Sequence, residues 1–361
     1  MTTNTGSAPA RRLLIVGGYG VVGTAVASAM RNTDWTVLTA ARRAAPTQML
    51  AGAPAADHLR IDLLNPAEIS DARSRLESVT DVVYCAYAER ESMAAAVEPN
   101  ASMLGNVLKG LRIAGARLQS VVLIGGGKSY AEHLGAYKSP AKESDPRFMG
   151  PIFYNDQEDI LWARAQTQGY NWTVLRPDAV IGPSIGSPMN LVMGIAAFAV
   201  TSRELNVPLR FPGSLAAWSA LHQATDSEIL GQAVRWALTS PSARNEIFNV
   251  TNGDNFRWQH LWPDVAEFFD MPVAAPQPMS LAEQMQDKAS LWERTIRKHN
   301  LKPTLWSELV SWPFLDGQLN FGTDMVQSTI KIRQAGFGAC VDSHQSILSH
   351  LRRLRDYRLI P

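Results

Sequence analysis

The stretch that decides the fold is Leu13-Leu14-Ile15-Val16-Gly17-Gly18-Tyr19-Gly20-Val21-Val22-Gly23. Its first four residues form a short apolar run, which is typical of a parallel strand covered on both faces. Glycines follow at the spacing Gly17-x-x-Gly20-x-x-Gly23, and residues 24–31 continue with helical spacing. Between a strand and a helix, such a turn lets backbone N–H groups and the helix N-terminus bind a pyrophosphate. The stretch therefore predicts a dinucleotide-binding turn.

Strand-like runs alternate with helical runs over the first half of the chain. The expected strands are 13–16, 36–40, 58–63, 81–86, 121–124 and 172–175. The expected helices are 24–31, 68–78, 102–114 and 156–166. This alternation predicts βαβ units, and hence an α/β fold with a doubly wound parallel Rossmann sheet.

Three parts are expected along the chain. Residues 1–12, rich in Thr, Ser, Ala and Pro, are interpreted as a flexible N-terminal arm. Residues 13–181 are expected to form mainly the dinucleotide-binding domain. Beyond residue 182 Pro, Trp and Met become frequent and helical runs such as 281–298 dominate, so residues 182–361 are expected to form a mainly helical substrate-binding or lid region, with short strands returning to the core.

Composition narrows the classes of partner. The chain has 361 residues, of which 46% are hydrophobic, as is ordinary for a globular enzyme. Its net charge of +1 gives no reason to expect nucleic acid or an anionic membrane as partner. No apolar run approaches the roughly 18 residues of a membrane span, and no signal peptide is recognisable. Two cysteines, Cys85 and Cys340, favour a reducing, cytoplasmic setting. The histidines are scattered without metal-ligand spacing, so no metal is expected.

The end of the second expected strand indicates the coenzyme. An NAD site places a carboxylate there for the ribose 2′-hydroxyl. This chain instead has Arg42 and Arg43, which suit a 2′-phosphate, so NADP(H) is the expected cofactor. Asp62, at the end of the third expected strand, is placed to meet the adenine edge.

The catalytic pair of ordinary short-chain dehydrogenases is missing. No tyrosine is followed four residues later by lysine. Lys128 follows the fifth expected strand, at the carboxyl edge where a nicotinamide should lie. Tyr154 falls just before the helix expected at 156–166 and is expected to reach the same crevice, where a cation would favour the phenolate and strengthen its hydrogen bond to a substrate oxygen.

Several motifs then resemble those of one known family. They are Gly127-Lys128-Ser129-Tyr130, Phe153-Tyr154-x-x-x-Glu158-Asp159, Trp172-Thr173-Val174-x-Arg176-Pro177, Leu209-Arg210-Phe211-Pro212-Gly213-Ser214 and Asn245-Glu246-x-Phe248-Asn249. From the glycine turn to the C-terminus the chain resembles the progesterone 5β-reductase/iridoid synthase-like (PRISE) group of atypical short-chain dehydrogenases/reductases. The chain departs from the family pattern in several places. Asn155 replaces a second tyrosine, Tyr87 replaces a tryptophan, residues 181–187 replace a Phe-Gly-Phe-Ser-Pro-Tyr-Ser stretch, and the region 312–329 matches only loosely.

The resemblance implies an NADPH-dependent reductase of an activated C=C bond in an enone or enal. Tyr154 would hydrogen-bond the substrate carbonyl and stabilise the enolate oxygen, while Lys128 would tune Tyr154 and hold the nicotinamide ribose. The expected cofactor contacts are Gly17, Tyr19, Gly20, Val21, Val22, Gly23, Arg42, Arg43, Asp62, Leu63, Ala86, Gly125, Lys128 and Tyr154. The expected substrate-pocket residues are Tyr87, Tyr130, Met189 and Trp218. The implied substrate is a small hydrophobic compound with a conjugated carbonyl, and the implied assembly is a homodimer.

The sequence leaves three other functions open. The same residues could reduce an aldehyde or ketone carbonyl instead of the C=C bond. The chain could also bind NADP(H) as a sensor without turnover. An extended nucleotide-sugar epimerase is disfavoured, because the Tyr-x-x-x-Lys pair is missing.

Overall fold

A seven-stranded sheet in the order β3-β2-β1-β4-β5-β6-β9 forms the centre of the molecule, and each neighbouring pair is parallel. The computed structural model describes residues 11–45 and 57–361. The strands are β1 Arg12–Val16, β2 Thr36–Ala41, β3 Asp57–Arg60, β4 Asp81–Tyr84, β5 Ser120–Ile124, β6 Asn171–Pro177 and β9 Glu246–Val250. The chain order reverses at β1, which pairs with both β2 and β4, so a ligand crevice is expected beyond the carboxyl ends of β1 and β4.

Helices cover both faces of this sheet, as the apolar run of β1 requires. On one face Leu14 and Val16 pack against α4 Met93–Ala114, α5 Phe153–Gln168, α2 Pro66–Asp71 and α3 Arg73–Leu76. On the other face Leu13 and Ile15 pack against α1 Val21–Ala29, α8 Ser227–Thr239 and α13 Ile330–Gln334. The side chains of Leu13, Leu14, Ile15 and Val16 are at most 1% exposed. The doubly wound α/β fold is therefore confirmed.

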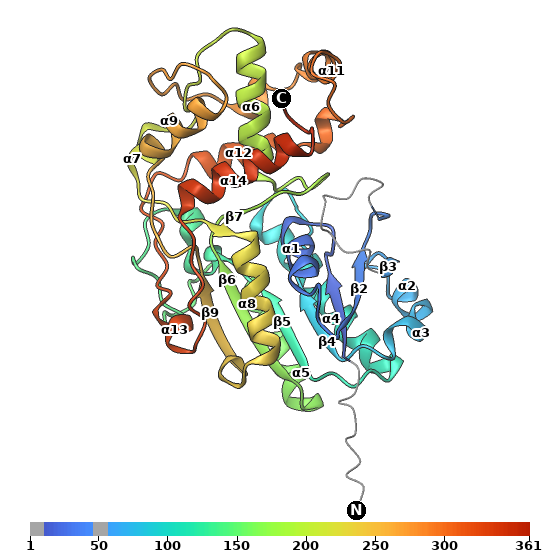
Figure 1. Cartoon of the computed structure of the whole chain (residues 1–361). Coiled ribbons are helices and arrows are strands. Elements are labelled where there is room, and N and C mark those ends of the chain that lie inside the picture. Colours follow the sequence, from blue (N-terminus) through green and yellow to red (C-terminus); the bar gives the residue numbers. More distant parts are fainter. Residues whose placement is uncertain (1–10, 46–56) are drawn as a thin grey trace, which may run out of the picture.

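A helical region lies beyond the carboxyl end of the sheet, at the top of Figure 1. Its helices are α6 Leu191–Glu204, α7 Leu215–Ser219, α9 Trp258–Phe268, α10 Leu281–Gln284, α11 Ala289–Lys298, α12 Trp312–Leu319 and α14 Ser343–Asp356. The short strands β7 Val180–Ile181 and β8 Thr225–Asp226 pair below it, and 3₁₀ turns occur at η1 Gly127–Tyr130, η2 Glu132–Leu134, η3 Pro241–Ala243 and η4 Trp306–Glu308. α6 is buried on almost every side in the core of this region.

Several expected boundaries were wrong. The helix expected at 102–114 begins at Met93, capped by the Ser92 side chain, and runs through Pro99. The helix expected at 156–166 begins at Phe153, so Tyr154 lies inside its first turn. The runs 68–78 and 281–298 each divide into two helices.

The expected N-terminal arm and the expected helical region each contribute residues to the central sheet. Residues 1–10 of the expected arm lie outside the described residues, whereas Arg12 already belongs to β1. Beyond residue 182 the alternation resumes, because α8 leads into β9 at the edge of the sheet. Among the described residues, no helix combines the length and apolar character that a membrane crossing needs.

Candidate active site

A crevice of about 680 Å³ lies where the carboxyl ends of β1, β4, β5 and β6 face the helical region. Its floor comes from the glycine turn, from residues that follow β4 and β5, and from the first turn of α5. α12 and Phe321 close the opposite side. The crevice therefore occupies the switch-point position at which open α/β sheets bind their ligands.

The glycine turn has the geometry of a phosphate cradle. Gly17 has a φ of +90°, and a Cβ there would lie 2.9 Å from the Ala86 nitrogen. A side chain at Gly23 would overlap the Gly17 carbonyl, which explains the close packing of α1 on β1. A Cβ at Gly20, in contrast, would meet only the Gly17 oxygen, at 3.5 Å, among the residues that the structure describes. Gly20 precedes α1 without any side-chain cap, so the first N–H groups of α1 suit a pyrophosphate.

The two arginines expected to select NADP(H) follow β2 directly, and both are exposed. The Arg43 guanidinium donates to the Tyr19 carbonyl at 3.3 Å and to the Gly186 carbonyl. It therefore lies beside the glycine turn, and the contact of either arginine with a 2′-phosphate stays a prediction. Val21 and Val22, like Ala86 and Gly125, line the crevice itself.

Asp62 and Leu63 lie at the margin of this arrangement. The Asp62 backbone N–H donates to Glu68 Oε2 at 2.8 Å, and its side chain accepts from the Leu64 N–H at 3.0 Å. Leu63 is buried among the side chains that cover the sheet. Neither residue lines the crevice, and their contacts with a coenzyme stay predictions.

The structure brings Lys128 and Tyr154 into the same crevice. Lys128 lies in η1, directly after β5, and Tyr154 lies in the first turn of α5. A Cβ at Gly126 would lie 2.8 Å from the Tyr154 hydroxyl. The lack of a side chain at Gly126 therefore leaves room for the phenol at the floor of the crevice. Within residues 11–45 and 57–361, no hydrogen bond engages the Tyr154 hydroxyl or the Lys128 ammonium.

The electrostatic setting keeps Tyr154 protonated. Burial raises the pKa of Tyr154, and Glu132 and Tyr87 raise it further. Burial lowers the pKa of Lys128, whereas Glu132 and Glu89 oppose this change. The direction for Tyr154 is opposite to the phenolate that was expected beside a lysine. The phenol is therefore equipped to donate a hydrogen bond.

The four expected pocket residues divide into two pairs. Tyr87 and Met189 line the crevice, and the Tyr87 ring stacks on Phe153 with centroids 5.4 Å apart. Tyr130 is buried away from it, where its hydroxyl donates to Asn249 at 2.6 Å. Trp218 packs on Phe211 in the helical region. The structure thus does not bring Tyr130 and Trp218 into the crevice.

Other lining residues were missed by sequence reasoning. Glu132 and Asp178 place two carboxyl groups in the crevice, and Phe314 and Phe321 provide part of its apolar wall. Asp178 directly follows Arg176-Pro177 at the end of β6, so the strand-end rule that selected Lys128 would also have found it. Nothing in the pattern around Glu132, Phe314 or Phe321 indicates their position.

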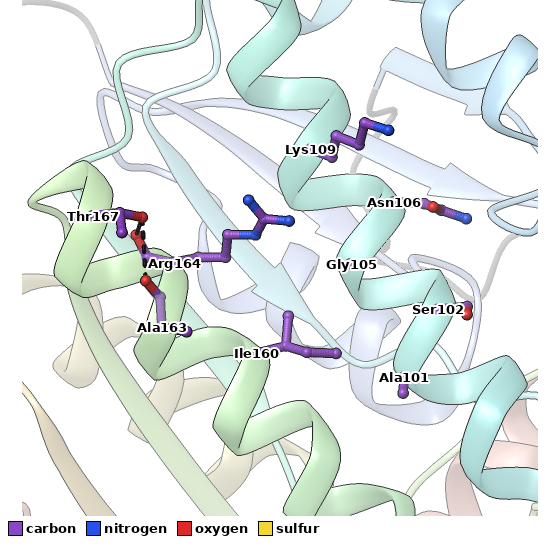
Figure 2. Close-up of a pocket in the computed structure, with 9 residues that line it drawn as sticks. All are labelled: Ala101, Ser102, Gly105, Asn106, Lys109, Ile160, Ala163, Arg164 and Thr167. Atoms are coloured by element: carbon purple, nitrogen blue, oxygen red, sulfur yellow. Dashed lines mark hydrogen bonds between the residues drawn. The ribbon is translucent and has the colours of Figure 1, made fainter.

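A second hollow, of about 580 Å³, lies on the outer surface between α4 and α5 and shares no residue with the crevice. Figure 2 shows Ile160, Arg164 and Thr167 on α5 opposite Gly105 and Lys109 on α4. The Thr167 hydroxyl donates to the Ala163 and Arg164 carbonyls within its own helix. The glycine turn, Lys128 and Tyr154 are all absent from this hollow, so the crevice is the candidate active site.

Similar solved structures share the fold at low sequence identity. A UDP-glucose 4-epimerase from Thermus thermophilus, solved with NAD, matches with a TM-score of 0.64 and 19% identity over 94% of this chain and 99% of that chain. The enzyme WbmG from Bordetella bronchiseptica, solved with NAD and UDP, matches with a TM-score of 0.66 and 16% identity over 99% and 98% of the two chains. These similarities support the Rossmann-type architecture.

Curated relatives match at higher identity over nearly the whole chain. An (S)-8-oxocitronellyl enol synthase from Camptotheca acuminata is 32% identical over 96% of this chain and 93% of its own length. A 3-oxo-Δ(4,5)-steroid 5β-reductase from Arabidopsis thaliana is 32% identical over 96% of this chain and 92% of its own length. The model of the PRISE-like Rossmann-fold domain matches residues 16–313. The chain therefore belongs to the PRISE family of short-chain dehydrogenases/reductases, the progesterone 5β-reductase/iridoid synthase-like oxidoreductases.

Proposed function

We propose that this protein is an NADPH-dependent reductase of an activated C=C bond in an enone or enal. The observation that carries the proposal is the pair formed by Tyr154 and Lys128. Both groups line one crevice beside a phosphate-binding turn, and both polar ends are unengaged among the residues that the structure describes. Such groups are available to a ligand.

Tyr154 acts on the substrate oxygen. Its protonated hydroxyl donates to the carbonyl and stabilises the negative charge that develops there, which is the role of an oxyanion donor. Lys128 binds the nicotinamide ribose and contributes positive charge beside the same atoms. When bound, the reduced nicotinamide supplies the hydride that the β-carbon accepts.

The coenzyme is NADPH rather than NADH. Arg42 and Arg43 follow β2, where an NAD site would place a carboxylate, and Arg43 already reaches the carbonyls of the glycine turn and of Gly186. Guanidinium groups form charge-assisted hydrogen bonds with a 2′-phosphate. Gly17, Gly20 and Gly23 receive the pyrophosphate.

The substrate is a small hydrophobic compound. Tyr87, Phe153, Met189, Phe314 and Phe321 give the crevice an apolar wall opposite the polar groups. This combination suits a substrate whose single polar handle is a conjugated carbonyl. The curated relatives, named for a steroid reduction and for an oxocitronellyl enol, fit that chemical class.

A cytoplasmic location and a homodimeric assembly are part of the proposal. Cys85 and Cys340 are both free thiols, as in proteins of reducing compartments. Light scattering of the purified protein measures the assembly, and a monomeric mass would contradict the dimer.

The test is NADPH oxidation with a small panel of cyclohexenone, an enal and progesterone, with product identification by NMR. We expect saturated carbonyl products from at least one member. An allylic alcohol would identify a carbonyl reductase instead. Tight NADP(H) binding without turnover across the panel would identify a sensor.

A further inference from the structure

Two carboxyl groups line the crevice in addition to Tyr154 and Lys128. Glu132 lies in η2 and Asp178 directly follows β6. Glu132 is only 7% exposed and Asp178 only 5%. Within the described residues, Glu132 Oε2 and Asp178 Oδ2 are buried without a hydrogen-bond partner. An unpartnered buried oxygen is costly, so both oxygens point to a ligand or a shared proton.

The Glu132 and Asp178 carboxyl groups line the same crevice as Tyr154. Consecutive glycines make room for the phenol and for the Glu132 carboxyl: a methyl at Gly126 would meet the Tyr154 hydroxyl, and a methyl at Gly127 would overlap Glu132 Oε2. Glu132 is also near enough to Tyr154 to raise the pKa of its phenol. In the substrate, the α-carbon is two bonds from the carbonyl oxygen that Tyr154 binds. An enolate held by Tyr154 would therefore share the crevice with both carboxyl groups.

The charges around this pair do not balance without a proton. Burial raises the pKa of Glu132, Asp178 raises it further, and Lys128 lowers it. Burial likewise raises the pKa of Asp178, against a hydrogen bond from the Ala179 N–H at 2.7 Å. The Lys128 ammonium compensates one negative charge, and exposed Glu89 acts on that same ammonium. His133 and Tyr137 also interact with these charged groups. Burial lowers the pKa of His133 and raises the pKa of Tyr137, so both side chains stay neutral. The second carboxyl is therefore stable only with a proton.

We propose that Glu132 and Asp178 share one proton and deliver it to the α-carbon of the enolate, so that the enzyme releases a saturated carbonyl compound rather than an enol. The electron pair of the enolate C=C bond forms the new C–H bond, the carbonyl C=O bond is restored, and a carboxyl O–H bond breaks. The pair recovers its proton from water after product release. This inference rests on the proposed reductase function.

The stereochemistry of the α-carbon tests the proposal. Reduction of 2-methylcyclohex-2-enone with NADPH creates a stereocentre at the carbon that receives the proton. Delivery by a fixed carboxyl gives one enantiomer in excess, whereas an enol released into water is protonated on either face. We expect the wild-type protein to give an enantiomeric excess, and Glu132→Gln and Asp178→Asn to lose it while still oxidising NADPH. Chiral gas chromatography of freshly extracted product measures the ratio.

Glu89→Gln is the matched control, because it removes a carboxylate that acts on Lys128 without belonging to the buried pair. It is expected to keep the enantiomeric excess. If Glu132→Gln and Asp178→Asn also keep it, or if the wild-type product is racemic, the proton-donor role is overturned and the reductase function stands. If Glu89→Gln loses it as fully as Glu132→Gln, the effect runs through Lys128, which also overturns the proposal.

Infrared difference spectroscopy separates this proposal from the reductase function, because it needs no turnover. The wild-type protein should show the C=O stretch of a protonated carboxyl at neutral pH, and Glu132→Gln should lack it. Absence of that band from the wild-type protein would overturn the shared proton even in an active enzyme. A wild-type band that Glu132→Gln lacks, without NADPH oxidation by any enone, would support the shared proton and refute the reductase.

Discussion

Arg176 and Glu158 form a buried ion pair that joins β6 to α5. Arg176 donates to Glu158 Oε1 from Nη2 at 2.6 Å and from Nε at 3.2 Å. Glu158 lies one helical turn after Tyr154 on α5. Arg176 Nη1 also donates to the Tyr130 hydroxyl at 3.3 Å, two residues after Lys128. One guanidinium therefore holds both elements that carry the proposed catalytic groups.

Glu158→Gln should destabilise the protein strongly. The change leaves the buried Arg176 charge without its counter-ion, which typically costs about 3–5 kcal/mol. Urea unfolding measures the loss. Asp159→Asn is the control, because Asp159 pairs with Arg147 at an exposed site where such a pair contributes up to about 1 kcal/mol. Equal losses in the two variants would contradict a structural role for the buried pair.

Tyr154→Phe should lower the rate of NADPH oxidation by about 10² or more, the usual range for one positioned donor. The coenzyme affinity, measured by fluorescence titration, should change little, because the hydroxyl acts on the substrate. Tyr170→Phe is the control. Its hydroxyl is buried at the turn between α5 and β6, has no hydrogen-bond partner among the described residues, and is not part of the crevice lining. Undiminished turnover by Tyr154→Phe would remove the assignment.

Gly126→Ala should impair catalysis without unfolding the protein. Gly126 has an extended backbone with a φ of 177°, which alanine adopts freely, but the new methyl would lie 2.8 Å from the Tyr154 hydroxyl. We expect a loss of turnover comparable to that of Tyr154→Phe, because the phenol must move. Gly105 lies on α4, and a Cβ there would meet no described residue within 4 Å. Gly105→Ala should therefore leave turnover intact and stabilise the helix by about 0.5–1 kcal/mol. A fully active Gly126→Ala enzyme would show that the position of the phenol is not critical.

The fold could be predicted from local sequence because the signals for it are local. Leu13 to Val16 alternate between the two cores of the sheet, and the glycine turn must follow such a strand. Helix boundaries were less certain. Pro99 obscured the first two turns of α4, which Ser92 caps. The helical spacing of residues 156–166 did not indicate that α5 begins three residues earlier and includes Tyr154 in its first turn.

The site was predictable only in part, because strand ends are visible in a sequence and tertiary contacts are not. Lys128 could be placed at the crevice because it follows β5. The coenzyme contacts of Arg42 and Arg43, which follow β2, stay predictions. Tyr130 is expected in the pocket, but the 3₁₀ turn η1 directs it to Arg176 and Asn249. The α12 residues reach the crevice only because the helical region, which is distant in sequence, packs over the carboxyl end of the sheet.

Arg42→Ala should weaken the preference for NADPH over NADH. Removing one charge-assisted contact with the 2′-phosphate, worth about 1.5–3 kcal/mol, should raise the KM for NADPH by roughly 10- to 100-fold and leave that for NADH nearly unchanged. Arg43→Ala should do the same and also lower stability, because Arg43 bonds to the Tyr19 and Gly186 carbonyls. Arg31→Ala, whose guanidinium bonds to Ser28 beside the end of α1, serves as the control. Equal effects on both coenzymes would contradict the assignment.

Asp226→Asn should lower stability in a pH-dependent way. Asp226 is buried where α8 meets α14, and its carboxylate accepts hydrogen bonds from His350 at 3.0 Å, from Ser346 and from the Glu228 N–H at 2.7 Å. Burial raises the pKa of Asp226, but these hydrogen bonds and the His350 charge outweigh it, so the net pKa is lowered.

A carboxyl whose folded pKa is lowered stabilises the protein above its unfolded pKa of about 3.9 and loses that contribution as the pH falls through the folded value. Urea unfolding at pH 7 should therefore show a loss of about 1.5–3 kcal/mol in Asp226→Asn, the range for hydrogen bonds to a charged group. The gap from the wild-type protein should narrow below pH of about 4. Asp287→Asn, at a fully exposed site, is the control and should leave the unfolding midpoint nearly unchanged. If the difference in unfolding free energy between Asp226→Asn and the wild-type protein stays constant down to the lowest pH measured, the residue stabilises through the shape of its side chain and not through its ionisation.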